Sequence, residues 1–217
     1  MGHLSLSAQH RLRSPRCHAL VLGLIALAGC GTVAPTRFHS LMPTEIVARP
    51  VAPAANGAAI VLEPIRVPVQ VDQPQWLVQL GDDSMAVLEQ ERWASPLRDE
   101  FRQALLEELI VGQGVVDSRT QPAGAAAAAR VGVDVRRFDS LPGREARIEG
   151  SWTISGGDAR TALRCEWLIR ETAAGSLGAL AAAHRRAVIR LGAAIGQALG
   201  RARRGEAAAC PALDAQR

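Results

Sequence analysis

Four cysteines are the side chains of this sequence best suited to covalent chemistry, and Cys30 has the most informative surroundings. Arg11, Arg13 and Arg16 precede an apolar run at 19–28, and no acidic residue comes before Cys30. The run is about half as long as the roughly 20 residues that cross a bilayer as a helix. A basic start, a short apolar stretch and small residues at its end are typical of a secretory signal peptide.

The end of this segment, Leu27-Ala28-Gly29-Cys30, is similar to a bacterial lipobox. The resemblance implies that the sulfur of Cys30 is acylated and that the chain is cut before it. We therefore expect residues 1–29 to be a lipoprotein signal peptide and 30–37 to be a lipidated N-terminus with a short tether. The alternative is a buried N-terminal helix with a chance cysteine. Seven residues separate Cys30 from Phe38, so the tether reaches at most about 25 Å.

The two remaining cysteines of an exported chain, Cys165 and Cys210, enter an oxidising compartment in which a disulfide is permitted but not required. Cys165 alternates with Leu163 and Trp167, so its side chain is expected to face the core. Cys210 follows the last expected helix. Two interpretations stay open: a disulfide that pins the tail to the sheet, or one buried inert thiol and one free thiol.

Other residues that could do chemistry form no recognisable constellation. His184 stands alone on an apolar helical stripe, which is more typical of a core histidine than of a base or a metal ligand. Asp82-Asp83 fit the chemistry of a turn better than a cation site. The sequence has no G-x-S-x-G, H-E-x-x-H, Walker A or C-x-x-C motif. We expect no catalytic residue, no metal site, no cofactor and no enzymatic activity.

The charge balance points away from nucleic acid as a partner. All 25 basic residues are arginines, and without the three in the signal peptide 22 arginines face 21 acids. The sequence pI of about 9.4 thus describes the precursor, and no basic cluster with interleaved aromatic residues occurs. The 188 residues from Cys30 onward suit one domain that can bury a core of its own.

The first half of the domain reads as strands followed by a helix. Strands are expected at 38–41, 59–67, 76–80 and 85–89, with a loop at 42–58 and a turn at Gly81-Asp82-Asp83. Pro64 inside the second run favours an edge strand or a bulge. Ser95 as N-cap and Pro96 as the first helical residue predict a helix that ends near Gly112 and Gly114.

The second half repeats this order. After a loop at 121–129, three alternating segments near 131–136, 146–154 and 163–170 predict an antiparallel meander. A last helix is expected at about 177–203. Together these elements predict an α+β fold: a single domain at 38–204, with a mainly antiparallel sheet and two main helices packed on one face. Residues 205–217 are expected to form a flexible tail.

Four segments together resemble one family. They are 38–41 (FHSL), 67–76 (VPVQVDQPQW), 92–97 (RWASPL) and 135–139 (VRRFD), in the order and spacing of the ABC-type transport auxiliary lipoproteins of the paraquat-inducible lipoprotein C type. The chain departs from the family pattern at Gln70, Gln73 and Ser95, which stand where an aromatic residue, an arginine and an acid are usual. The missing arginine puts any family-wide salt bridge at position 73 in doubt.

The resemblance implies a non-enzymatic, outer-membrane-anchored subunit of a Gram-negative intermembrane lipid transport system. Its implied partners are an MCE-domain protein that spans the periplasm, the permease and ATPase of that system, and outer-membrane lipid at the acylated Cys30. Gly31 is not the aspartate that retains a lipoprotein in the inner membrane, which agrees with this localisation. A homo-oligomer is a further expectation that the sequence leaves open.

Three functional hypotheses follow. In the first, the domain is a docking module, and the stiff polar loop Asp72-Gln73-Pro74-Gln75 is its candidate partner-binding site. In the second it is a lipid carrier, which needs an apolar cavity between sheet and helices. Tight packing of Leu105, Trp152, Trp167 and Leu191 would reject the carrier. A periplasmic hydrolase is the third hypothesis, and no motif supports it.

Overall fold

A computed structural model of the chain describes residues 34–42, 59–81, 84–120, 127–156, 162–207 and 209–213. The chain divides into two units, Met1–Pro35 and Thr36–Arg217, and every element below belongs to the second. The expected signal peptide, Cys30, the loop at 43–58 and the Asp82-Asp83 turn lie outside the described residues.

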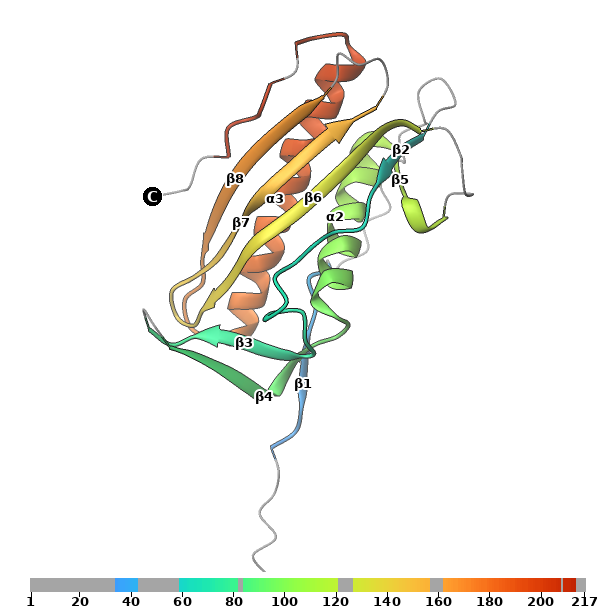
Figure 1. The fold of residues 1–217 in the computed structure, drawn as a ribbon. Helices are drawn as coiled ribbons and strands as arrows, with labels where there is room; N and C mark the ends of the chain where they lie inside the picture. The colour runs from blue at the N-terminus through green and yellow to red at the C-terminus, as the bar shows by residue number, and fades with distance from the viewer. Residues whose placement is uncertain are drawn as a thin grey trace, which may run out of the picture. The chain divides into compact units, whose positions relative to one another are not determined.

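The larger sheet has five strands in the order β5-β2-β6-β7-β8 (Figure 1). Strands β6, β7 and β8 form the predicted antiparallel meander, whereas β2 pairs in parallel with both β5 and β6. The strands are β2 (Ala59–Leu62), β5 (Val115–Asp117), β6 (Ala127–Leu141), β7 (Glu145–Ser155) and β8 (Leu163–Thr172).

A bulge in β6 changes which of its residues face the core. Val131, Val133 and Val135 are buried, and the register against β7 then shifts between Val135 and Arg137. The extra residue reverses the alternation, so that Phe138 and Ser140 face the core beyond it, and Leu141 at the end of the strand is also buried. This shift brings a serine hydroxyl into the core.

The smaller sheet has three strands in the order β1-β4-β3. They are β1 (Arg37–His39), β3 (Gln75–Gln79) and β4 (Met85–Trp93). β3 and β4 form an antiparallel hairpin, and β1 adds to the other side of β4 in parallel. The inner face of this sheet buries Trp76, Val78 and Trp93.

Both main helices lie on one face of the five-stranded sheet, as expected (Figure 1). α2 (Leu97–Gln113) packs along α3 (Leu177–Arg203), and α3 also packs against β7 and β8. α2 ends at Gly114, whose backbone has φ of 61°, a conformation that glycine adopts without a steric penalty. The expected end of α2 and the bounds of α3 are confirmed.

The α+β single domain is confirmed, but it contains two mixed sheets in place of one mainly antiparallel sheet. Parallel pairing of β2 with β5 is possible because the long connection between them includes α2. Of the edge strand or bulge predicted from Pro64, the edge position is wrong, because β2 lies between β5 and β6. The strand expected at 59–67 ends at Leu62, before the proline, and the register shift that it has lies between Ala59 and Ile60. The expected loop at 121–129 is too long, since β6 begins at Ala127.

The N-cap of α2 also differs from the prediction. Pro96, not Ser95, occupies that position, and no side chain from the cap residue bonds to the helix. Ser95 instead donates its hydroxyl to Glu100 over 2.8 Å. The Asp72 carboxylate, from the loop before β3, accepts from the backbone N–H of Arg98 in the first turn.

A buried hydrogen-bonded chain joins the two sheets and α3. The indole N–H of Trp76 on β3 donates to the hydroxyl oxygen of Ser140 on β6 over 2.8 Å. The same oxygen lies 2.8 Å from Nε2 of His184 on α3. Because an indole N–H can only donate, Ser140 accepts there and its own proton is free to go to Nε2. With this assignment the indole N–H, the Ser140 hydroxyl and Nε2 of His184 each have a hydrogen-bond partner.

A buried ion pair between Arg102 and Asp117 holds α2 against the five-stranded sheet. The guanidinium of Arg102 pairs with Asp117 on β5 and also donates to the carbonyl oxygens of Leu62 and Glu63 at the end of β2. Burial raises the pKa of the Asp117 carboxyl, but hydrogen bonds from Arg102 and Arg119 outweigh this effect and hold the pKa well below its ordinary value.

Replacing Ser140 tests the buried chain. The Ser140→Ala variant leaves the Trp76 N–H and His184 Nε2 without a partner inside the core, so we expect a loss of about 1–3 kcal/mol in the free energy of unfolding. Ser155→Ala, at an exposed end of β7, is the matched control and should change stability by less than about 0.5 kcal/mol. Urea denaturation measures both; equal stability of the two variants would contradict the assigned role.

Candidate functional site

Ser40 and Leu41, which we call the entry segment, are held by hydrogen bonds to side chains of both main helices. Glu100 on α2 is buried and accepts hydrogen bonds from the Ser40 hydroxyl and the Leu41 backbone N–H, over 2.7 and 2.8 Å. The guanidinium of Arg185 on α3 donates to the carbonyl oxygens of Ser40 and Leu41. Both helices therefore hold the residues that directly follow β1.

The loop Asp72–Gln75 is less free than its polar composition suggests. Asp72 forms an ion pair with the guanidinium of Arg98 and is mostly buried. The carbonyl oxygen of Pro74 accepts from the Trp93 backbone N–H over 3.0 Å, and Gln75 already belongs to β3. Pro74 is exposed, whereas Gln73 and Gln75 are half-buried. Asp72 thus stabilises the start of α2, and the exposed surface of the loop centres on Pro74.

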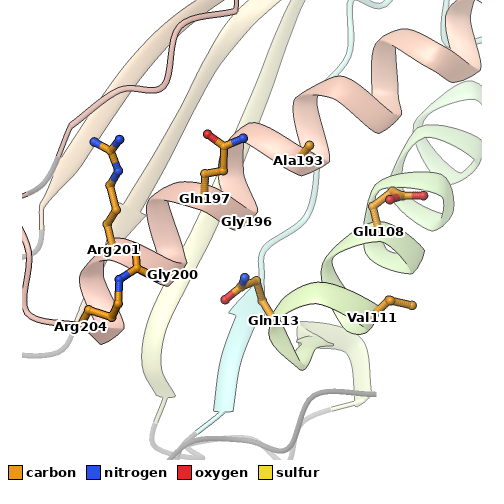
Figure 2. A pocket seen from close by; sticks show the side chains of 10 residues that line it. Glu108, Val111, Gln113, Ala193, Gly196, Gln197, Gly200, Arg201 and Arg204 are labelled. Atoms are coloured by element: carbon orange, nitrogen blue, oxygen red, sulfur yellow. The ribbon is translucent and has the colours of Figure 1, made fainter. Parts of the chain in front are cut away.

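An open groove of about 610 Å³ runs between α2 and α3 (Figure 2). Its floor is the glycine row Gly192, Gly196 and Gly200, and polar side chains line its walls. A β-carbon on Gly192 would lie 2.8 Å from that of Glu108, so glycine at this position permits the close approach of the helices. The wall residues are Glu108, Val111 and Gln113 on α2, Ala193, Gln197 and Arg201 on α3, and Arg204 just beyond it.

His184 is sealed inside the domain. Its ring stacks on Phe138 with a centroid separation of 3.9 Å and is fully buried. Burial lowers the pKa of His184 to about 3, so the ring is neutral at ordinary pH. Among the described residues, its Nδ1 atom has no hydrogen-bond partner. A neutral imidazole without access to solvent is placed to organise the core and not to exchange protons with a substrate.

Cys165 and Cys210 are joined by a disulfide, with their Cα atoms 5.6 Å apart. Cys165 is buried on β8, at an edge of the five-stranded sheet. Leu213, three residues beyond Cys210, packs against the hydrophobic core. The bond therefore holds residues 209–213, part of the expected flexible tail, against the domain.

The described residues contain no group of three or more His, Cys, Asp or Glu side chains arranged to hold a metal ion. Neither helix in this part of the chain combines the length and apolar character that a membrane span requires.

Two features of these surfaces were missed from the sequence. The glycine row of the groove has a signal, the spacing G-x-x-x-G-x-x-x-G at 192–200, which allows close helix packing. The role of Glu100 has none, because its partners Ser40 and Leu41 lie about 60 residues away in the chain.

Comparison with solved structures places this arrangement in a known class of α+β domains. The structure of a protein from Xanthomonas campestris assigned to the family DUF330 is 17% identical, with a TM-score of 0.61, over 78% of this chain and 98% of that one. A second, of an uncharacterised protein, is also 17% identical, with a TM-score of 0.60, over 76% and 98% of the two chains. At this identity the likeness shows a shared fold.

The family follows from the sequence model that matches residues 40–196, described as the ABC-type transport auxiliary lipoprotein component. The chain belongs to this family, so the expected family assignment is confirmed. A comparison with curated proteins found no match to the chain. The protein is therefore a transport auxiliary lipoprotein by family, with the α+β fold described above.

The buried imidazole predicts how stability depends on pH. The unfolded chain protonates His184 near its ordinary pKa of about 6.5, whereas the folded chain does so only near 3. Between these values the unfolded state binds more protons, so stability falls as the pH falls. From pH 6.5 to 4.5 we expect wild type to lose about 2 kcal/mol more than His184→Gln.

Urea unfolding at the two pH values measures this difference, because the carboxylates titrate alike in both proteins. If the free energy of unfolding fell by the same amount in wild type and His184→Gln, His184 would be protonated in the folded state at pH 4.5.

Proposed function

We propose that this protein is a lipoprotein anchored in the outer membrane, where it acts as the non-catalytic docking subunit of an MCE-type intermembrane lipid transport system. The observation that carries the proposal is the family match, which extends over residues 40–196 and so covers nearly all of the described domain. The family is defined by an auxiliary role in ABC-type transport. The proposed partners are the periplasm-spanning MCE-domain protein and its permease and ATPase.

The packing of the domain favours docking over carriage of a lipid. Leu105 and Leu191 from the helices are fully buried, and Trp152 and Trp167 from the sheet are nearly so. These four side chains occupy the layer between sheet and helices in which a carrier would need an apolar cavity. The groove between α2 and α3 is instead open and lined largely by polar side chains.

The fastening of the entry segment supports an anchoring role. An acyl anchor on Cys30 would connect to the domain through β1 and the residues that Glu100 and Arg185 hold. Gly31 in place of an aspartate favours the outer membrane over the inner one. The domain would then lie within about 25 Å of the lipid surface, too close to span the periplasm by itself.

The loop Asp72–Gln75 is the proposed docking surface. Its ion pair with Arg98 and the bond from Trp93 to Pro74 hold its backbone in one conformation, and a preordered loop loses little entropy on binding. The groove between α2 and α3 is the second candidate, because it is a concave polar surface formed by two packed helices.

The anchor is tested with Cys30→Ala. The domain begins after the tether and its core owes nothing to the acyl chains, so we expect this variant to leave the membrane fraction while retaining the thermal unfolding midpoint of the wild-type domain. Cell fractionation and thermal denaturation measure the two properties. A variant that stays with the membranes although residues 1–29 have been removed would show that Cys30 is not the anchor.

The docking surface is tested with two variants of matched chemistry. Gln73→Glu adds a negative charge to the loop, and Gln197→Glu adds the same charge to the exposed wall of the groove. Crosslinking in intact cells, followed by detection of the MCE-domain protein, measures docking. We expect Gln73→Glu to lower the crosslinked fraction severalfold and Gln197→Glu to leave it near the wild-type value.

The reverse pattern would move the docking surface to the groove. Absence of any crosslink between wild type and the MCE-domain protein would reject the proposed partner. Equal unfolding midpoints for the two variants ensure that a lost crosslink reflects docking and not stability.

A further inference from the structure

Exposed apolar side chains gather on one part of the domain. Among the described residues, four of the large hydrophobic side chains that face solvent belong to the three-stranded sheet or the end of its hairpin: Phe38, Leu80, Met85 and Val87. Phe38 and Leu80 are about two-thirds exposed, at 65% and 66%. The other two, Val69 and Ile189, lie outside this sheet. Groups of exposed apolar residues of this kind mark sites of interaction.

Strand alternation places Phe38, Met85 and Val87 on the outer face of the sheet, and Leu80 lies just beyond the end of β3 in the hairpin. Met85 and Val87 alternate with Ala86 and Leu88, which pack against the core. Phe38 precedes His39, whose ring lies against the buried Trp76. We name the four residues Phe38, Leu80, Met85 and Val87 the apolar face.

The same sheet receives the chain that comes from Cys30. β1 begins at Arg37, so only six residues separate the proposed acylation site from the sheet. Seven Cα–Cα steps span at most about 25 Å. Of all the described surface, the sheet containing β1 is therefore held closest to the anchor along the chain.

We propose that the apolar face rests on the lipid surface of the membrane in which Cys30 is anchored. The inference rests on the acylation of Cys30 in the proposed function and adds an orientation: the three-stranded sheet faces the bilayer. A short tether gives a weak contact a high effective concentration, so a small apolar face is sufficient. The free end of the domain then presents the helices and the five-stranded sheet to the periplasm.

The charges near the apolar face define which lipid chemistry it takes. Charges of both signs lie near the apolar face: Arg92 is the strand partner of Phe38, Arg136 and Arg137 line a pocket together with Met85, and the exposed Glu89 follows Val87 on β4. Arg136 and Arg137 are themselves ion-paired with Glu166 and Asp139. This mixture selects no headgroup charge, so the contact is made by apolar side chains with the acyl-chain boundary of zwitterionic lipid. Phosphatidylcholine vesicles are the appropriate probe.

Short-range quenching of a new tryptophan tests the orientation. The four native tryptophans are all buried, so a tryptophan introduced at an exposed site reports on its own surroundings. Leu80→Trp places one on the apolar face, and Ile189→Trp places one on α3 as the matched control. Full-length acylated proteins are reconstituted into phosphatidylcholine vesicles with or without bromine on the acyl chains, and wild type supplies the background.

We expect the brominated lipid to quench the added fluorescence of Leu80→Trp, with a blue-shifted emission, and to leave that of Ile189→Trp unchanged. Equal thermal midpoints of the variants and wild type confirm that both fold. Proteins that float with the vesicles while neither tryptophan is quenched would overturn the orientation and leave the anchor intact. Quenching at both sites would also overturn it, because no one face would be selected.

Two other outcomes are informative. Failure of the wild-type protein to float with vesicles would reject the acyl anchor and the orientation that depends on it. A blue shift of Leu80→Trp only after addition of the MCE-domain protein would assign the apolar face to a protein partner and reject the lipid contact.

Discussion

The architecture depends on the buried chain from Trp76 through Ser140 to His184. Its three members come from β3, β6 and α3, which are otherwise parts of the small sheet, the large sheet and the helical layer. The indole N–H, the Ser140 hydroxyl and Nε2 of His184 would each be costly to bury alone, and together they satisfy one another. The geometry requires the β6 bulge, since without the reversal of alternation before Phe138 the Ser140 hydroxyl would point to solvent.

A separate set of polar contacts connects the domain to the chain that precedes it. Glu100 and Arg185 come from different helices and hold opposite hydrogen-bonding groups of the segment at Ser40 and Leu41, an N–H in one case and carbonyl oxygens in the other. The backbone there cannot rotate without breaking bonds to both helices. The domain thus has a stiff point of attachment, and the apolar face lies on the sheet that carries it.

Elements defined by their own residues could be predicted from the sequence. Alternation in 146–154 and 163–170 gave the antiparallel strands β7 and β8, and the apolar stripe of α3 gave its full extent.

Features defined by residues far apart in the chain could not be predicted. Local rules favour Ser95 as a helix cap, but Glu100 takes its hydroxyl and Asp72 supplies an acceptor from 26 residues away. Pro64 suggested an edge strand because the sequence does not reveal that β2 stops before it. For the candidate site, the sequence indicated the polar loop but not the ion pair with Arg98 that holds it, nor the groove that two distant helices form.

The parallel pairing of β1 with β4 has a mechanical consequence. A pull on the residues before Arg37, directed along β1, acts in shear on the hydrogen bonds between β1 and the part of β4 opposite it, Glu91–Trp93. In shear these bonds carry the load together, whereas peeling a strand from its end would break them one after another. The bonds from Ser40 and Leu41 to the helices lie next in line and share the same load. A domain held to a membrane by this strand can therefore resist tension through a three-residue pairing that would be weak if it were unzipped.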